Sequence, residues 1–576
     1  MNGSNGSGEA ESGRRPRFLA AALGDCVHVA GIARVCYLAE QAGWETEFLG
    51  PAVEPAAAVA AIARWRPDVA GLSYRLSPDA GERVLREFAR LEAAAGLHGV
   101  RHWFGGTPPV AARARGLGFF ERVFDGREGE EAIVAALHGR EPAGGELRPP
   151  DRLIDRIGWA APRPLLRHHY GEPAYARTLA GVAALAERGV LDVISLGVDQ
   201  NTQEHFFRPA EMDERQHGAG GVPVRSAAQF RELYAASRRG NFPLLRSYSG
   251  TRDMVPMARL LLETIHLAWG AVPLTWYSRL DGRSAVPLRE HIAEAQATMR
   301  LLAGAGTPVE MNESHHWSLR DAPDAVAVAM AFLAAYNARA CGVRDYVAQY
   351  MFNTPPGSSF QMDLAKMLAK VELIEGLQRE GRDGEPGYRV FRETRTGLSS
   401  LPADLDVAKG HLASSVFLQM ALRPHIVHVV AHVEADHAAT ADDVAEAAQI
   451  ARGAIRNGLY GQPNMTADPE VQARRAELVE EAWTILDAVR GLAPAGVSDP
   501  WADPGTITAA VNIGLIDAAQ LRNNPEARGE VAVRIIGGAC RSVDPDTGRP
   551  ITERQRVARV LDRAARRGAG LAAAAG

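Results

Sequence analysis

Short apolar runs alternate with amphipathic stretches along the first 126 residues of the chain. Each run has the length of a strand, and the stretches between the runs have helical periodicity. Strands separated by helices of about 10–15 residues fold into a parallel sheet with helices on both faces. The pattern therefore predicts an α/β domain built on a doubly wound, Rossmann-like sheet. Its expected strands are residues 17–24, 44–50, 68–74, 100–106 and 121–126.

A second and longer series of the same kind follows from about residue 161. Seven or eight βα units in one run fit a (β/α)₈ barrel, and a second long doubly wound sheet is the structural alternative. A long charged helix from residue 469 then begins an extension of the barrel. The expected barrel strands are residues 190–198, 241–248, 271–278, 307–314, 345–352, 387–394 and 425–433.

A stretch rich in Pro and Gly, residues 141–152, lacks apolar periodicity and predicts a boundary between two domains. The first residues are rich in Gly, Ser and Asn and predict a tail. The resulting divisions are a tail (1–16), a doubly wound domain (17–140), a linker (141–160), a TIM-like barrel (161–468), its C-terminal extension (469–565) and a second tail (566–576).

Composition narrows the class of partner. The 576-residue chain has a net charge of −5 and therefore lacks the basic field that binds nucleic acid. No apolar run approaches the ~18–20 residues that cross a bilayer, so we expect no membrane partner. The N-terminus lacks the apolar segment of a signal peptide, and the four cysteines form no CxxC pair. These features favour a cytoplasmic location.

The loop after the first predicted strand carries the pattern D-x-H-x-x-G, formed by Asp25, His28 and Gly31. The carboxyl ends of strands in a doubly wound sheet face the ligand crevice. At this edge an imidazole can offer one nitrogen to a metal, while a nearby carboxylate holds the other nitrogen and fixes the tautomer. The glycine lets a bulky group approach the backbone.

Two later strand ends complete the pattern. Ser73 ends the third predicted strand, with Leu76 after it, and Gly105 and Gly106 end the fourth. Together with D-x-H-x-x-G, this set resembles the cobalamin-binding domain of adenosylcobalamin mutases and methionine synthase, in which the serine and leucine are one residue closer. The resemblance implies that His28 replaces the nucleotide base as the lower cobalt ligand and that Asp25 orients it. It also implies that Ser73, Gly105 and Gly106 line a slot for the displaced nucleotide tail.

The second half of the chain resembles the catalytic subunit of glutamate mutase (methylaspartate mutase), a barrel. This resemblance implies that Arg246 and Arg167 bind substrate carboxylates, which suits the guanidinium fork. It also implies that Glu434 contacts the ribose of an adenosyl group. The stretches that carry the resemblance best are residues 192–203, 243–263, 294–313 and 432–451.

Some positions depart from that family. A third substrate arginine falls on Gln203, and the loop that binds the substrate ammonium group is shorter here, in residues 275–284. Polar pockets reject analogues that leave their groups unpaired, so a remodelled pocket argues against glutamate as the substrate. A lysine that contacts the ribose falls on Val430, which leaves the upper ligand of cobalt open.

The sequence therefore predicts an enzyme of the isomerase class, an adenosylcobalamin-dependent carbon-skeleton mutase with a radical mechanism. Its expected partner is a small carboxylic or amino acid, and its expected assembly is a homodimer. Two alternatives stay open. The chain can be a cobalamin-dependent methyltransferase or methyl carrier, or a mutase-like cobalamin protein adapted to another task.

Histidines crowd the last predicted barrel strand, at positions 425, 428, 432 and 437. On an alternating strand His428 and His432 share a face, and Glu434 lies beyond them. Such a group can form a second metal site. The alternative is a set of hydrogen-bonded polar residues at the mouth of the barrel.

Overall fold

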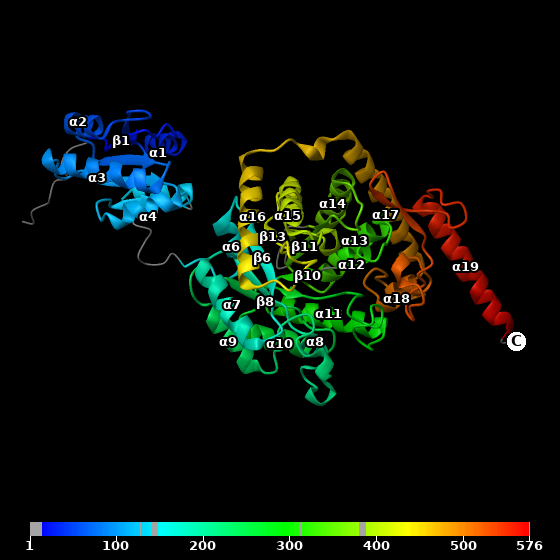
Figure 1. The fold of residues 1–576 in the computed structure, drawn as a ribbon. Coiled ribbons are helices and arrows are strands. Elements are labelled where there is room, and N and C mark those ends of the chain that lie inside the picture. Colours follow the sequence, from blue (N-terminus) through cyan, green and yellow to red (C-terminus); the bar gives the residue numbers. More distant parts are fainter. Residues whose placement is uncertain (1–13, 127, 140–147, 312, 379–386, 575–576) are drawn as a thin grey trace, which may run out of the picture. The chain divides into compact units, whose positions relative to one another are not determined.

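The computed structural model describes residues 14–126, 128–139, 148–311, 313–378 and 387–574 (Figure 1). They form two compact units, of which the first ends at Leu147 and the second begins at Arg148. Each unit has a hydrophobic core of its own. No helix within the described ranges is long and apolar enough to span a membrane.

The first unit is a five-stranded parallel sheet with the strand order β2-β1-β3-β4-β5. All five expected strands are present, and the doubly wound fold is confirmed. Because the order reverses between β1 and β3, a ligand crevice is expected at the carboxyl ends of these strands. The strands are β1 (Arg17–Ala22), β2 (Glu45–Phe48), β3 (Val69–Tyr74), β4 (Arg101–Gly106) and β5 (Arg122–Phe124). The helices are α1 (Ala30–Gln41), α2 (Pro55–Trp65), α3 (Pro78–Ala94), α4 (Pro108–Gly116) and α5 (Glu130–Leu137).

Alternation along β1 explains why helices cover both faces of this sheet. Phe18 packs with α1 and α5 in one core cluster, and Leu19 packs with α2, α3 and α4 in another. Successive side chains on a strand point to opposite faces. A strand that is apolar at every position therefore has to be buried on both faces.

The second unit is an eight-stranded parallel barrel with the strand order β8-β7-β6-β13-β12-β11-β10-β9. A parallel bridge between Tyr248 and Ala271 joins the two ends of that order. The predicted barrel is thereby confirmed. Its strands are β6 (Leu165–Tyr170), β7 (Val193–Leu196), β8 (Leu244–Ser247), β9 (Gly270–Ala271), β10 (Val309–Met311), β11 (Asp345–Phe352), β12 (Arg389–Thr396) and β13 (Ile426–His428).

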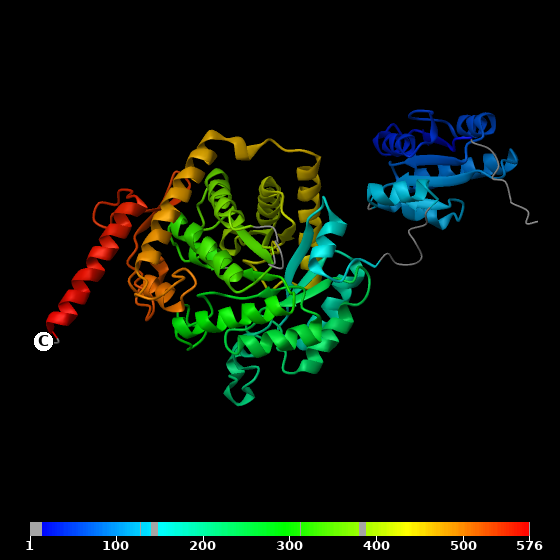
Figure 2. The ribbon, with the colours of Figure 1, turned by 180° about the vertical axis from the view of Figure 1, so that it is seen from behind.

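Helices surround the barrel on its outer side (Figure 2). They are α7 (Tyr175–Arg188), α9 (Ala227–Ser237), α10 (Met254–Ile265), α11 (Leu288–Gly304), α13 (Asp324–Ala340), α14 (Phe360–Glu375), α15 (Leu405–Gln419) and α16 (Ala441–Tyr460). Two short helices, α8 (Gln200–His205) and α12 (Glu313–Ser318), follow the ends of β7 and β10. The second half of the expected linker is α6 (Leu153–Ala160), which packs beneath the barrel.

Two strand predictions in the barrel were wrong. Strand β6 was not expected, because its inward-facing Arg167 and His169 interrupt the apolar run. The run 271–278 was expected to be one strand, but only Gly270–Ala271 are paired. Pro273 has no N–H for a ladder, and the amides of Leu274 and Thr275 donate instead to the carboxylate of Glu313, at 2.9 and 3.1 Å.

The C-terminal extension packs against the outer helices of the barrel. Helix α17 (Pro469–Gly491) contacts α13 and α14, and α18 (Pro504–Asn512) contacts α11. A two-stranded hairpin, β14 (Val533–Ile536) and β15 (Ala539–Ser542), precedes the last helix, α19 (Glu553–Ala574). Helix α19 thus continues into the segment that was expected to be a tail (Figure 1).

Candidate functional site

A cavity of about 400 Å³ opens at the carboxyl ends of β1, β3, β4 and β5. We call it the slot. It is lined by all the residues predicted for cobalamin binding except Asp25, that is, by His28, Gly31, Ser73, Gly105 and Gly106. The sheet brings these residues together because the register pairs Ser73 with Gly105 on neighbouring strands.

The loop between β1 and α1 carries His28 and Asp25, and both side chains are exposed. Asp25 accepts a hydrogen bond of 2.9 Å from the hydroxyl of Tyr74. Burial, followed by this hydrogen bond, raises the pKa of Tyr74 to about 12. The expected hydrogen bond between Asp25 and His28 is absent from this structure, so the orientation of His28 by Asp25 stays a prediction.

Glycines give the slot its width. A Cβ atom added at Gly31 or Gly105 would meet nothing within 4 Å, so these positions border open space. At Gly71 the same atom would lie 2.5 Å from the ring of Phe18. At Gly106 it would lie 2.8 Å from the carbonyl oxygen of Tyr74. Larger side chains at these positions would fill the slot or push its walls apart.

Two hydrogen-bonding groups of the slot have no partner in the described part of the chain. They are the hydroxyl of Ser73, which is 5% exposed, and the indole Nε1 of Trp103, which is 2% exposed. The other lining includes the apolar side chains of Phe18, Ile32 and Phe124. Buried polar groups are normally hydrogen-bonded. The slot is therefore suited to a largely apolar group that carries hydrogen-bond acceptors, which fits the nucleotide tail of a corrinoid.

Residues 16–137 match the B12 binding domain family. Cobalamin is the cofactor of this B12-binding domain. When it is bound, the resemblance assigns the cobalt ligand to His28 and the lining of the slot to Ser73, Gly105 and Gly106. The open borders at Gly31 and Gly105, and the two unpartnered donors, fit that cofactor.

Solved structures add only distant similarities. A cobalamin-binding protein from Desulfitobacterium hafniense DCB-2 is 24% identical with a TM-score of 0.18, over 19% of this chain and 52% of that protein, about half its length. The radical S-adenosylmethionine methyltransferase TsrM from Kitasatospora setae is 12% identical with a TM-score of 0.18, over 65% of this chain and 72% of that one. The cobalamin-dependent S-adenosylmethionine radical enzyme OxsB is 10% identical with a TM-score of 0.19, over 84% and 69%. TM-scores this low carry no argument about the reaction. No curated protein matches the chain.

Inside the barrel, an apolar layer near the amino ends of the strands lies beneath a polar one. The apolar layer includes Leu165, Val193, Leu244, Val347 and Ile426, with α6 below it. The residues above it are linked by hydrogen bonds and ion pairs, and we call them the polar layer. They are Arg167, Ser195, Arg246, Glu310, Gln349, Glu393 and His428.

Arg167 is enclosed in the polar layer with all its nitrogens in use. Its Nε donates to Ser195 at 2.9 Å, and its Nη1 contacts Glu310 at 2.9 Å and also Glu393. Its Nη2 lies 2.9 Å from Nε2 of His169. These contacts use four of the five N–H donors of the guanidinium and leave one on Nη2. Arg167 thus holds the polar layer together, and its predicted contact with a substrate carboxylate stays a prediction.

Arg246 is fully buried but keeps unused donors. Its Nη1 lies 3.3 Å from the hydroxyl of Ser195, and its Nη2 lies 3.3 Å from a carboxylate oxygen of Glu310. Its Nε and Nη2 make no hydrogen bond with a described residue. The guanidinium lies 5.1 Å from the ring centres of both Tyr248 and Trp269. The predicted role of Arg246 is compatible with this geometry.

Arg395 is the residue that the sequence interpretation missed. It stands beside His428 in the register of β12 and β13, two residues beyond Glu393 on its own strand. It is 6% exposed, and it forms no hydrogen bond or ion pair with the described residues. The strand expected from the sequence ended at residue 394, whereas β12 continues to Thr396. Arg395 therefore lay outside the expected strand, and the alternation of inward and outward side chains was not extended to it.

Glu434, the predicted ribose contact, lies six residues beyond the end of β13 and is exposed. Arg246 and Arg167 share contacts with Ser195 and Glu310, whereas Glu434 forms no hydrogen bond or ion pair with either arginine. Burial raises the pKa of Glu434, and the charge of Arg395 opposes this effect. The role of Glu434 stays a prediction.

Neutral imidazoles surround these arginines. Burial and neighbouring arginines lower the pKa values of His169, His315, His316 and His428 well below the usual range, so these rings are uncharged at pH 7. Both ring nitrogens of His316 and Nδ1 of His315 are buried without a partner in the described chain. They add unused donors and acceptors at the carboxyl end of the barrel.

The histidines near β13 do not form a metal site in the described ranges, where no group of three candidate ligands lies close enough to hold an ion. His425 accepts a hydrogen bond from the amide of Arg392, and His437 bonds Asp436 and Asp443. The second-metal alternative is therefore not supported by the structure.

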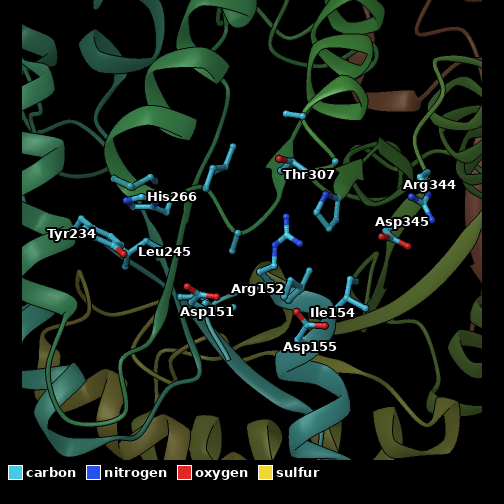
Figure 3. A pocket seen from close by; sticks show the side chains of 18 of the residues that line it. Asp151, Arg152, Ile154, Asp155, Tyr234, Leu245, His266, Thr307, Arg344 and Asp345 are labelled. Carbon is cyan, nitrogen blue, oxygen red and sulfur yellow. The ribbon is translucent and has the colours of Figure 1, made fainter. Parts of the chain in front are cut away.

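A larger cavity of about 670 Å³ lies at the opposite, amino end of the barrel strands (Figure 3). Arg152, Asp345 and His266 border it. Arg389 pairs with Asp345 at 2.6 Å, and no described lining side chain has a buried polar atom without a partner. In barrels of this kind the amino end supports stability, whereas the carboxyl end holds the active site. This cavity is not the candidate site.

Proposed function

We propose that the chain is a cobalamin-dependent isomerase that rearranges the carbon skeleton of a small carboxylic or amino acid. The observation that carries this proposal is the surplus of buried positive charge at the carboxyl end of the barrel. The polar layer and Arg395 together hold three arginines against two glutamates, Glu310 and Glu393. Burial raises the pKa of Glu393, which favours its neutral form. A protonated Glu393 would increase the excess of positive charge.

An unpaired buried cation is costly. The penalty for removing an ion from water is several kcal/mol even after the protein relaxes. A carboxylate that binds between Arg395 and Arg246 offsets this penalty and accepts the unused N–H groups of both. The substrate class that this end of the barrel best supports is therefore an organic anion, and a carboxylate matches the guanidinium fork in geometry.

The chain's own groups orient and shield the substrate. Arg246 and Arg395 bind its carboxylate, and the neutral imidazoles of His315 and His316 hydrogen-bond its remaining polar atoms. Adenosylcobalamin, when bound, supplies a radical that removes a substrate hydrogen and later returns it. The closed barrel, with its apolar lower layer, excludes water that would intercept reactive species.

The cysteines argue against a radical S-adenosylmethionine reaction, the class of two of the distant structural relatives. Iron–sulfur clusters are held by several thiolates that lie close together. Cys26 and Cys36 belong to the first unit, and Cys341 and Cys540 belong to the second. Each unit thus has only two, all four are buried, and burial raises the pKa of Cys36 to about 12.

The test uses the full chain loaded with adenosylcobalamin under anaerobic conditions. A panel of small acids, with and without amino groups, is added while electron paramagnetic resonance records Co(II)–radical pairs. We expect a signal and an isomerised product with at least one acid. Arg395→Gln should raise KM roughly 100-fold, the loss expected for two charge-assisted hydrogen bonds.

Arg389→Gln is the matched control, because Arg389 lies at the other end of the same strand and is paired with Asp345. It should leave the signal unchanged. Absence of a radical signal with every acid would overturn the isomerase proposal. Transfer of a methyl group from methylcobalamin to a panel member would assign the alternative, a methyltransferase.

A further inference from the structure

The slot of the B12-binding domain has a rim and a floor. In the register of the sheet, Ser73 pairs with Gly105, and Gly71 pairs with Trp103. Residues two apart on a strand share a face. Trp103 therefore points to the same side as Gly105 but lies about 6.6 Å further from the carboxyl end of β4. Ser73 stands at the rim, and Trp103 forms the floor.

The ring of Trp103 is an ordinary core residue. It packs against Phe18 at 5.9 Å and Phe124 at 5.7 Å between ring centres. Its N–H is different, because Trp103 lines the cavity and this N–H is buried without an acceptor in the described chain. Phenylalanine would give the same apolar floor and would leave no donor unpaired. The indole is best explained by an acceptor that arrives with a ligand.

The chemistry of the nucleotide tail indicates which acceptor this is. The tail runs from the corrin through phosphate and ribose to an aromatic base, so the base is the part that reaches the floor. If His28 takes the lower position on cobalt, the base nitrogen that coordinates cobalt in the free cofactor is released with its lone pair. We propose that the indole N–H of Trp103 donates a hydrogen bond to this nitrogen, so that Trp103 selects corrinoids whose lower base carries a ring nitrogen.

The test measures dissociation constants of the full-length protein by absorbance titration with three corrinoids. Cobalamin has a benzimidazole base with a ring nitrogen, a cresolyl cobamide has a phenolic base without one, and cobinamide has no nucleotide tail. The wild type should bind cobalamin about tenfold more tightly than the cresolyl cobamide, the size expected for one buried hydrogen bond. Trp103→Phe should bring that ratio to about one and leave the affinity for cobinamide unchanged.

Trp44→Phe is the matched control, because Trp44 is a buried member of the same core cluster that does not line the slot. It should keep the wild-type ratio. The proposal is overturned if Trp103→Phe keeps the ratio, or if Ser73→Ala abolishes it while Trp103→Phe does not. If Trp103→Phe also weakens cobinamide binding, the substitution has disturbed the slot itself. The ratio is then measured with benzothienylalanine at position 103, which keeps the shape of indole but lacks the N–H. An unchanged ratio in that variant overturns the proposal.

Discussion

Replacing Glu310 with glutamine tests whether the polar layer is held by charge. Glu310 is fully buried and lies 2.9 Å from Arg167 and 3.3 Å from Arg246. Its carboxylate also accepts hydrogen bonds from Trp269 at 2.6 Å and Gln349 at 3.1 Å. Glutamine has nearly the same shape but no charge, and its NH2 group replaces one of the two acceptor oxygens, so Glu310→Gln removes the charge and one accepted hydrogen bond.

The size of the expected loss in stability depends on which charges stay buried after the substitution. In Glu310→Gln, Arg167 and Arg246 share Glu393 as the remaining carboxylate of the polar layer. Removing one partner from a buried ion pair typically costs about 3–5 kcal/mol, because the other charge stays buried without compensation. The negative charge of Glu310 raises the pKa of Glu393, so its loss lowers that pKa and favours the charged form of Glu393. This change offsets part of the cost. We therefore expect a loss of about 3 kcal/mol in the free energy of unfolding at pH 7.

The pH dependence has a definite sign. The arginines hold the pKa of Glu310 below its usual range in spite of burial. A carboxyl with a lowered folded pKa contributes stability above its unfolded pKa of about 4.3 and loses it as the pH falls through the folded value. The difference between wild type and Glu310→Gln should stay constant from pH 7 down to about 5 and shrink below that.

Guanidinium-induced unfolding, followed by circular dichroism across this pH range, measures the difference. Glu375→Gln is the matched control, because Glu375 pairs with Arg392 at 2.6 Å on the outside of the barrel and is about one quarter exposed. Pairs that solvent reaches contribute about 0–1 kcal/mol. A loss in Glu310→Gln no larger than that in Glu375→Gln would refute the argument.

Three further predictions concern single positions. His28→Ala should change the visible absorption bands of the cobalamin-loaded protein; identical spectra would remove His28 as the lower ligand. Gly105→Val should weaken cobalamin binding at least tenfold with an unchanged melting temperature, because the added Cβ meets open space in the slot; a lower melting temperature would indicate packing damage instead. Lys370→Met should stabilise the protein by at least about 1 kcal/mol at pH 7, because burial lowers the pKa of Lys370 to about 7 and its Nζ has no partner in the described chain. The unfolded chain holds that proton up to about pH 10.4, so the stability of the wild type should rise with pH above 7, and the methionine variant should lack this rise in unfolding titrations.

The B12-binding domain could be predicted from its sequence because the information is local. The central strands β1 and β3 are short, mostly apolar runs, and the predicted ligand residues lie close to strand ends, Ser73 within the last two residues of β3 and His28 in the loop after β1. Trp103 escaped notice because a tryptophan in an apolar strand is indistinguishable from core. Its unpaired N–H is found only from the three-dimensional structure, in which the register places Trp103 beside Gly71 and Trp103 lines the slot.

The barrel was harder to interpret because its polar groups are defined by contacts between distant segments. Arg167 and Arg395 look alike in the sequence, since each lies in a mixed strand. Their difference comes from Glu310, which is 143 residues away from Arg167 in the chain and forms an ion pair with it, but forms no ion pair or hydrogen bond with Arg395. No periodicity within one segment carries that information. The sequence therefore placed both Arg167 and Arg246 within the barrel, but it gave no sign that Arg395 also points inward without a partner in the described chain.

The two units share one physical signature of function. A chain selected for stability alone would pair or remove Arg395 and would place phenylalanine at position 103, because each unsatisfied group lowers stability without ligand. Arg395 lies near the carboxyl end of its strand, and Trp103 lies on the floor of a slot that opens at the carboxyl ends of the sheet, where α/β folds bind ligands. Among the described residues, the cavity at the amino end of the barrel has no such group. Buried polar groups without a hydrogen-bond partner therefore indicate a ligand site better than cavity volume does. The described residues that line the larger cavity have no such group, whereas the smaller slot has two, at Ser73 and Trp103.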